Sequence, residues 1–560
     1  MNDIQLTQHS FAKKALHQPQ HRFADLYHLI CRKEWIEFAL TAVLGNTGSR
    51  TAGVDGITKR DFESEQFRTE FIAQLQQDLK QGVYRPSPVK RQWIPKPSGE
   101  KRGLGIPTIR DRTVQMLLKM LLEPIFESDF LECSKGFRPG RRTMDCIAEC
   151  YAHIQTRHKY FWVIEGDIRK CFDRVHHETL LHLVERRIDD RRIVNLLNAF
   201  LKSGVMEDGL ISPSLEGVPQ GGIISPLLTN IYLHELDLWW WEAVGKLLNY
   251  QKTNRRKSGK ANYRLVRYAD DFIILSNGTK EQAEAIRDAV QQFLWEHLHL
   301  ELNLEKTHVT HATDGFDFLG FHVQYMRPRD NKPWLRVIPS ERSIARLKAK
   351  IEEMTSRRRV FDTPLNKVMA INRVLRGWIT YYQHVSVKRT ATKLDWWVGQ
   401  RFVGWLEDKH KLGYRRIKAM YEVQETKHRK NYGVHNTRGD LVCLFRMADV
   451  HLTSYRRRKK PNPYLLDDSA YTTLPIYESE SPLVDDIWLG QSSQSKWHEI
   501  RYQILERDGY RCQRCNSSDD LDVHHLTARK DDGFDEPDNL VTLCRQCHTK
   551  TESWGKKKSA

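Results

Sequence analysis

The sequence predicts an α+β protein that is divided into several domains. Its 560 residues exceed the usual size of a single domain. Short, β-rich apolar segments alternate with amphipathic helical patterns up to about residue 340, and helical patterns dominate beyond it. A segment rich in Pro, Ser and acidic residues, 461–496, then precedes a compact region rich in Cys and His at 497–554.

The chain is strongly basic, with a formal net charge of +18 and a pI of about 9.3. The usual polyanionic partner of such a protein is nucleic acid, although a merely soluble basic protein would have the same charge. The N-terminus lacks the apolar core of a signal peptide, and no segment is long enough to span a bilayer. We therefore expect an intracellular protein with no membrane partner.

Local patterns predict the order of elements in the first part of the chain. Helical patterns alternate with polar turns over 23–83, a Pro-, Gly- and basic-rich hairpin region covers 92–112, an apolar helix covers 113–126, strands cover 161–168 and 316–323, two short strands flank a polar turn within 265–275, and a helix covers 279–297.

The region after residue 339 is predicted to be largely helical. Apolar residues recur at three- and four-residue spacing at Ile344, Leu347, Ile351 and Met354, which indicates an amphipathic helix. Helix continues to about residue 416. Most of the tryptophans in this region are expected to be core residues, and they are Trp378, Trp396, Trp397 and Trp405.

Three carboxylates lie where predicted apolar strands end or turn. Asp167 is near the end of the strand 161–168, and Asp270 and Asp271 lie in the hairpin 265–275. A hairpin with Asp at its tip, beside a strand that ends in Asp, brings the carboxylates together. Such a cluster repels itself unless divalent cations bind, and two Mg²⁺ ions would support nucleotidyl transfer. An Asp pair alone is more often a solvated turn, but charges are rarely placed inside an apolar hairpin without a function.

Several blocks, in order, resemble those of reverse transcriptases. The blocks are Ile94–Lys96 and Lys101–Pro107 (a fingers hairpin), Glu165–Asp173 (EGDIRKCFD, a first metal motif), Gly217–Pro226 (GVPQGGIISP, a nucleotide-contacting loop and helix) and Tyr268–Asp271 (YADD, a second metal motif). Gly136–Gly140 (GFRPG) and Gly377–Tyr382 (GWITYY) resemble blocks of group II intron-encoded proteins, the second from their maturase, or thumb, domain. The resemblance covers about residues 20–560.

The resemblance implies a right-hand polymerase with fingers, a palm built on an antiparallel sheet, and a helical thumb. It also implies that Asp167, Asp270 and Asp271 hold two Mg²⁺ ions, assisted by the backbone carbonyl of Ile168. Phe172 would stack beneath the sugar of the incoming nucleotide and block a 2′-hydroxyl, which selects dNTPs. The alternative for Phe172 is a core residue.

Three further positions would contact the nucleotide if the resemblance holds. Lys96 and Arg102 would bind the triphosphate as a point charge and a fork, and Gln220 would line the pocket. For each of them, an ordinary solvated polar residue is the alternative.

The C-terminal region contains two C-x-x-C pairs, Cys512–Cys515 and Cys544–Cys547. Two such pairs are typical of a tetrahedral Cys₄ site that holds structural Zn²⁺. The six remaining cysteines are scattered, and in a reducing compartment they are predicted to be free thiols.

Polar residues between and after these pairs resemble the HNH endonucleases, which have a small ββα-metal fold. The resemblance implies that His525 is the general base, that His524 and His548 hold one divalent cation, and that Asn539 braces the loop or lies near the metal. The division of roles between His524 and His525 stays open. A zinc-stabilised DNA-binding module without catalysis is the alternative.

The resemblance also divides the chain into domains. They are residues 1–90 (N-terminal extension and start of the fingers), 91–330 (fingers and palm), 331–450 (thumb, or maturase, domain), 451–496 (basic DNA-binding region and acidic linker) and 497–560 (HNH endonuclease).

We therefore expect an RNA-directed DNA polymerase of a mobile group II intron that also acts as splicing maturase and site-specific DNA endonuclease in target-primed reverse transcription. The expected partners are the intron RNA, double-stranded target DNA, an RNA template with a DNA primer, and dNTPs. The expected compartment is the bacterial cytoplasm, as a nucleoid-associated ribonucleoprotein, or an organelle. The alternatives are a retron or defence reverse transcriptase, which the GFRPG, GWITYY and HNH blocks disfavour, and a splicing-only maturase, which the intact carboxylates disfavour.

Overall fold

The structure, a computed structural model, divides into two compact units. One comprises Met1–Ala345 and Tyr455–Ile487, and the other Arg346–Ser454 and Trp488–Ala560. The residues that it describes are 3–95, 101–155, 159–207, 210–212, 216–219, 221–327, 333–426, 429–456, 462–465, 486–487, 501, 504–518, 521–526 and 540–548.

The first unit begins with helices that pack on a long buried helix, α5. These helices are α1 (Asp3–His17), α2 (Tyr27–Ile30), α3 (Lys33–Gly45), α4 (Glu65–Gln81) and α5 (Ile109–Glu127). Helices α1, α2 and α3 all contact α5, which contains the apolar helix predicted at 113–126. Thr108 caps α5, since its hydroxyl accepts a hydrogen bond from the Asp111 backbone nitrogen.

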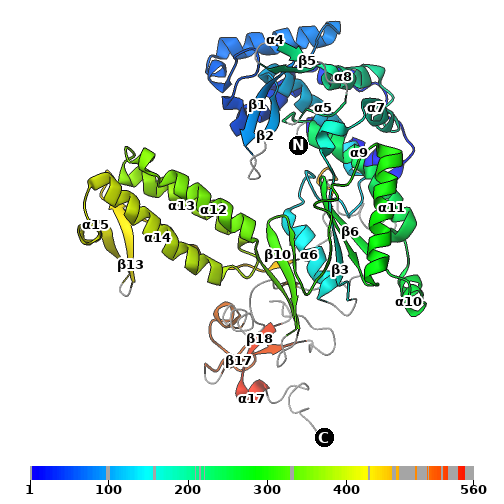
Figure 1. The fold of residues 1–560 in the computed structure, drawn as a ribbon. Helices are drawn as coiled ribbons and strands as arrows, with labels where there is room; N and C mark the ends of the chain where they lie inside the picture. Colours follow the sequence, from blue (N-terminus) through cyan, green and yellow to red (C-terminus); the bar gives the residue numbers. More distant parts are fainter. Residues whose placement is uncertain are drawn as a thin grey trace. The chain divides into compact units, whose positions relative to one another are not determined.

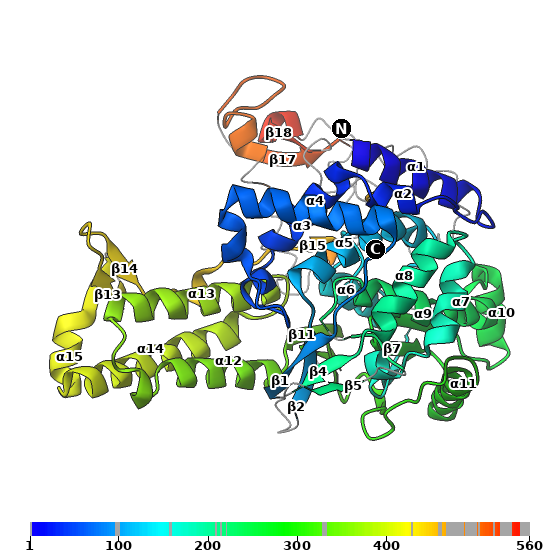
Figure 2. The ribbon, with the colours of Figure 1, turned by 90° about the horizontal axis from the view of Figure 1, so that it is seen from above.

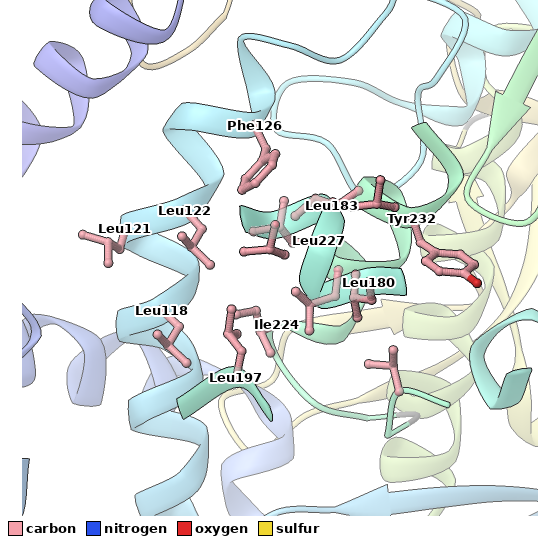
Figure 3. Packing of buried hydrophobic residues seen from close by; sticks show 14 of the residues in the cluster. Leu118, Leu121, Leu122, Phe126, Leu180, Leu183, Leu197, Ile224, Leu227 and Tyr232 are labelled. Atoms are coloured by element: carbon pink, nitrogen blue, oxygen red, sulfur yellow. The ribbon is translucent and has the colours of Figure 1, made fainter. Parts of the chain in front are cut away.

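The other side of α5 packs into the core of the same unit. This core includes α7 (His177–Glu185), α8 (Arg191–Lys202) and α9 (Ser225–Trp240). Figure 3 shows Leu122 and Phe126 of α5 near Leu227 of α9. Interlocking leucines of this kind bury apolar area without polar partners, which stabilises the helix arrangement.

A four-stranded sheet in the order β2-β1-β4-β5 lies beside these helices. Its strands are β1 (Val89–Pro95), β2 (Lys101–Ile106), β4 (Val205–Glu207) and β5 (Leu210–Ser212). Strands β1 and β2 form an antiparallel hairpin in which Arg102 pairs with Ile94, as the hairpin prediction for 92–112 required. Strand β4 adds to β1 in parallel.

A second sheet, β6-β7-β3-β8, is antiparallel throughout (Figure 1). Its strands are β3 (Trp162–Asp167), β6 (Tyr263–Tyr268), β7 (Asp271–Ser276) and β8 (Val309–His311). Helix α6 (Thr143–Ile154) contacts β6, and α11 (Lys280–Leu298) contacts β3. The strand predicted at 161–168, the hairpin within 265–275 and the helix predicted at 279–297 are confirmed. The short helix α10 (Asn249–Lys257) precedes β6.

The single strand predicted at 316–323 is wrong. The segment forms two strands, β9 (Phe316–Phe318) and β10 (Phe321–Met326), with Phe318 paired to Phe321. The two residues between them, Leu319 and Gly320, have φ angles of +51° and +82°. Positive φ at both central residues defines the tight hairpin turn that matches strand twist, so the chain reverses here. Strand β11 (Trp334–Pro339) completes this sheet.

The second unit contains long helices that lie side by side in both ribbon views (Figures 1 and 2). Its elements are most of α12 (Glu341–Met354), α13 (Pro364–Tyr382), α14 (Lys388–His410), α15 (Tyr414–Tyr421), and the sheet of β12 (Glu422–Thr426), β13 (Arg429–His435) and β14 (Leu441–Cys443). The amphipathic helix predicted from Ile344 onwards is confirmed as α12, which buries Leu347, Ile351 and Met354.

The expectation that most tryptophans of this region are core residues is wrong. Only Trp405 is fully buried, and its indole nitrogen donates to the Arg359 carbonyl at 3.0 Å. Trp378 and Trp397 are half-buried, and Trp396 is 68% exposed. Arg389, Lys393 and Trp396 follow one another at helical spacing on α14, and all three are exposed. They therefore form a solvent-facing stripe along one face of the helix.

After the helical region the chain returns to the first unit. Strands β15 (Tyr455–Arg456) and β16 (Asp486–Ile487) pair there. The Tyr455 hydroxyl donates to Asp145 Oδ1 at 2.7 Å, and the Tyr464 hydroxyl donates to Glu123 Oε2 at 2.5 Å. Most of the predicted linker 461–496 lies outside the described residues.

The C-terminal region contains a two-stranded antiparallel hairpin followed by a short helix. They are β17 (Leu521–His525), β18 (Leu540–Cys544) and α17 (Arg545–His548). Within the described part of the chain, no helix is long and apolar enough to cross a membrane.

Candidate functional site

The sheet β6-β7-β3-β8 brings three carboxylates to one end of its central strands. Asp167 is the last residue of β3 and pairs directly with Asp271, the first residue of β7. Tyr268 pairs with Asp271 across the hairpin, so Ala269 and Asp270 form its two-residue turn. Residues that pair directly on antiparallel strands present their side chains on the same face, so Asp167 and Asp271 are neighbours.

The electrostatics of this cluster are those of crowded negative charge. Burial and the charges of Asp270, Asp167 and Glu165 together raise the pKa of Asp271 to about 7, against the opposing charge of Lys306. Burial and Asp167 also raise the pKa of Asp270, while Arg102 and Arg267 oppose this shift. Oxygen ligands that resist ionisation because they repel one another fit hard divalent cations, which remove the repulsion.

Asp167 is held by a segment that returns to the sheet much later in the sequence. Asn303 Nδ2 and Lys306 Nζ donate to Asp167 Oδ2 at 3.2 and 3.0 Å. The Asn303 backbone nitrogen donates to the Asp167 carbonyl at 2.7 Å, and Ile168 forms an antiparallel bridge with Leu302. Asn303 and Lys306 were not predicted from the sequence, because no local pattern indicates that residues 300–306 lie beside β3.

A cleft of about 1230 Å³ joins this cluster to the β1–β2 hairpin. Its lining includes four of the predicted site residues beside Asp167, and they are Arg102, Ile168, Phe172 and Asp270. Lys101 and Arg91 add positive charge at the hairpin side. Lys96 and Gln220, which were predicted to bind the nucleotide, lie outside the described residues.

The turn that carries Phe172 is clamped by the glycine-rich loop that precedes α9. The Val218 backbone nitrogen donates to the Phe172 carbonyl at 2.7 Å, and the Gly217 nitrogen donates to the Val175 carbonyl at 2.8 Å. Gly217 has a φ of +90°, and a Cβ there would lie 2.8 Å from the Asp173 carbonyl oxygen. Glycine is required at this position because of both the conformation and the approach.

The C-terminal region contains the four predicted cysteine ligands as one cluster. The Sγ atoms of Cys512, Cys515, Cys544 and Cys547 all lie within 4.8 Å of one another. Sulfurs around a tetrahedral Zn²⁺ are about 3.8 Å apart, given Zn–S bonds of about 2.3 Å, so the donor set fits zinc.

The surroundings of Cys512 favour the thiolate over the thiol. Burial raises the pKa of this thiol, but hydrogen bonds from the backbone of Cys544, Arg514 and Cys515 outweigh burial. The net pKa of Cys512 is about 6. Burial and the neighbouring cysteines raise the pKa of Cys547 to about 12. Metal ligation requires thiolates, and of these two cysteines Cys512 ionises the more readily.

Two histidines of this region lie on β17 and α17. The rings of His524 on β17 and His548 on α17 are 4.8 Å apart between centroids. Asp522 Oδ2 lies 3.8 Å from His548 Nδ1, which the sequence analysis did not foresee. The His525 backbone pairs with Leu540. The side chain of His525 and all of Asn539 lie outside what the structure describes.

Three protein families match consecutive parts of the chain. Residues 94–323 match "Reverse transcriptase (RNA-dependent DNA polymerase)", residues 344–421 match "Group II intron, maturase-specific domain", and residues 512–553 match "HNH endonuclease". The first match contains the carboxylate cluster and the third contains the four cysteines.

Individual proteins are similar to parts of the chain. Protein YkfC of Escherichia coli is 39% identical over 358 residues, which are 60% of this chain and 92% of YkfC. The group II intron-encoded protein LtrA of Lactococcus lactis is 34% identical over 355 residues, 54% of this chain and 57% of LtrA. The putative COX1/OXI3 intron 2 protein of Saccharomyces cerevisiae is 28% identical over 327 residues, 51% of this chain and 36% of that protein.

Proposed function

Because the chain belongs to the group II intron-encoded reverse transcriptases and maturases that carry an HNH endonuclease domain, we propose that Asp167, Asp270 and Asp271 are its polymerase centre. The single observation that carries this proposal is the direct pairing of Asp167 with Asp271, with Asp270 in the adjoining turn of one cleft.

The three carboxylates and the Ile168 carbonyl would hold two Mg²⁺ ions. When bound, these ions supply the charge that activates the primer 3′-hydroxyl and neutralises the pyrophosphate. Around them, Arg102 binds the triphosphate and Phe172 packs beneath the sugar, so that dNTPs are selected over NTPs. By resemblance, Lys96 also contacts the triphosphate and Gln220 lines the base pocket. The fold would be that of a right hand, with fingers, palm and thumb.

The helical second unit would bind nucleic acid through its exposed basic and aromatic residues. The stripe of Arg389, Lys393 and Trp396 on α14 offers phosphate contacts and a stacking surface. Lys348 of α12 lies over the Trp397 ring at 5.7 Å, which extends the same basic and aromatic character. The match to the maturase-specific domain implies that intron RNA is one partner, and the primer–template duplex would be another.

The C-terminal module would nick target DNA and so supply the primer. His525 would be the general base, and His524 and His548 would hold one divalent cation, with Asn539 nearby. Asp522 would orient the His548 ring through Nδ1, as carboxylates beside metal-bound histidines do. The four cysteines would hold a structural Zn²⁺.

The remaining parts of the proposal concern organisation and place. The functional segments are residues 1–90, 91–330, 331–450, 451–496 and 497–560, and the three family matches lie within the second, third and fifth of them. The protein would act in the bacterial cytoplasm or in an organelle. Its relatives include a group II intron-encoded protein of Lactococcus lactis and a mitochondrial intron maturase of Arabidopsis thaliana.

RNA-templated primer extension by the full chain tests the polymerase centre. We expect wild type to extend an oligo(dT) primer on poly(rA) with dTTP and Mg²⁺, and to use UTP poorly. Asp270→Asn should abolish extension, while Asp288→Asn, an exposed acid on α11, should not change it. Equal extension by wild type and Asp270→Asn would overturn the proposal.

A further inference from the structure

The turn that carries Asp270 rests on a buried ion pair that contacts neither the cleft nor the metal ligands' oxygens. Arg267 near the end of β6 and Asp237 on α9 each have 0% of their side chains exposed. Arg267 Nε donates to Asp237 Oδ1 at 2.9 Å, and Nη2 donates to Oδ2 of the same carboxylate. Two parallel hydrogen bonds fix the plane of the guanidinium, which one bond would not do.

The third nitrogen of this guanidinium reaches the turn itself. Nη1 donates to the Ala269 carbonyl at 2.9 Å and to Asn230 Oδ1 at 3.2 Å. Ala269 has a φ of +58°, a left-handed conformation in which Cβ crowds the backbone and which alanine rarely adopts. The hydrogen bond from Arg267 therefore holds a turn conformation that the local sequence disfavours.

Gly136 closes the other side of the turn. A Cβ at Gly136 would lie 2.2 Å from the Ala269 nitrogen, so only glycine permits this approach. Asn230 Nδ2 donates to the Gly136 carbonyl at 2.8 Å, while its Oδ1 accepts from Arg267. The turn is thus held between Arg267 and Gly136, and Asn230 connects the two.

The stability of this ion pair does not explain its presence, because buried pairs of charges can often be replaced by apolar residues without loss. The geometry of the pair explains its presence, because the pair connects the Ala269–Asp270 turn to α9. This helix begins directly after the glycine-rich loop. We propose that Arg267 and Asp237 are positioning residues, which set where Asp270 and Asp271 present their carboxylates to metal ions. This inference rests on the proposed role of those two carboxylates.

The test compares the Mg²⁺ dependence of Arg267→Lys with that of a matched variant, Arg187→Lys. Lysine keeps the charge but cannot form the fork. Arg187 is also buried, donates to the Ala15 carbonyl and lies 3.0 Å from Asp129, away from the cleft. For Arg267→Lys we expect half-activation by Mg²⁺ to rise about tenfold and kcat to fall about 100-fold, with KM for dTTP changing less than about threefold. Arg187→Lys should lower Tm but leave these three quantities unchanged.

A second readout does not depend on activity. The rise in Tm that Mg²⁺ gives the full-length chain should require about tenfold more Mg²⁺ in Arg267→Lys than in wild type. If Arg267→Lys does not fold, Asn230→Ala keeps the ion pair and should shift the Mg²⁺ dependence in the same direction. The proposal would be overturned if a folded Arg267→Lys or Asn230→Ala chain required the same Mg²⁺ concentration as wild type. It would also be overturned if Mg²⁺ did not change the Tm of wild type. Absence of primer extension by wild type would instead contradict the proposed function, and the thermal measurement would still decide this inference.

Discussion

The carboxylate cluster around Asp167 and the cysteine cluster around Cys512 both have the chemistry of metal sites, but their surroundings differ. The carboxylates lie at the end of a four-stranded sheet beside a large apolar core. The cysteines lie in a C-terminal region whose described core is small, with Ile504, Leu505, Val523 and Leu540 as one part. In the first region the fold holds the ligands against their own repulsion. In the second, we expect the metal to hold the fold, because so small a core contributes little stability alone.

Removal of the zinc ligands should produce the largest structural effect. Cys512→Ser should unfold the C-terminal module, since structural Zn²⁺ contributes about 10 kcal/mol or more to the folding of such modules. Hydrogen exchange should then lose protection over residues 504–548, while the sheet β6-β7-β3-β8 keeps its protection. Cys443→Ser, which changes a half-buried free thiol elsewhere, is the control and should change neither region. A protected module in Cys512→Ser would remove the contrast between the two regions.

Removal of a carboxylate from the Asp167 cluster should reduce activity without reducing stability, in contrast to removal of a cysteine. Asp270→Asn should lower primer extension by about 1,000-fold or more, because it removes a ligand of the ions that stabilise the transition state. Its Tm without metal should be no lower than that of wild type, because one of the repelling charges is gone. Thermal unfolding followed by circular dichroism, alongside the extension assay, measures both. A clearly lower Tm would mean that Asp270 serves the fold.

A change in the sheet beneath the carboxylates should reduce stability and activity together. A Cβ at Gly166 would lie 2.2 Å from the Phe272 ring on the neighbouring strand. Gly166→Ala should therefore destabilise the protein by about 1–3 kcal/mol through overpacking. Extension activity should fall as well, because Asp167 is adjacent to Gly166 and Asp271 is adjacent to Phe272. Urea denaturation gives the stability change, and unchanged stability would mean that the sheet accommodates the methyl group elsewhere.

The pH dependence of stability should reveal the repulsion directly. Folding raises the pKa of Asp271 from 3.8 to about 7. The stability that a raised pKa contributes is fully present below pH 3.8 and is lost as the pH rises through about 7. In EDTA, Asp271→Asn should therefore exceed wild type in Tm by about 1–2 °C at pH 8, equivalent to about 1 kcal/mol, and show no gain at pH 4. A gain that is equal at both pH values would exclude ionisation as its cause.

Local sequence patterns predicted which residues come together where those residues lie close in the chain. The two C-x-x-C pairs and the hairpin with Asp270 at its turn are of this kind. The supports of the carboxylates were missed, because Asn303, Lys306 and Asp237 approach the cluster only through the folded chain, and none of them belongs to a local motif. The turn at Leu319 and Gly320 was missed although its glycine is a turn signal, since the apolar run around it favoured one continuous strand.

Measurement of DNA synthesis and DNA nicking on the same preparation tests the central claim most directly. Wild type, Asp270→Asn and His525→Ala would be purified with their intron RNA and given labelled target DNA and dNTPs. We expect Asp270→Asn to nick the target but add no nucleotides. We expect His525→Ala to leave the target intact but to extend a primer that is already nicked. Synthesis by Asp270→Asn at the wild-type rate would contradict the assignment of the polymerase centre to the carboxylate cluster.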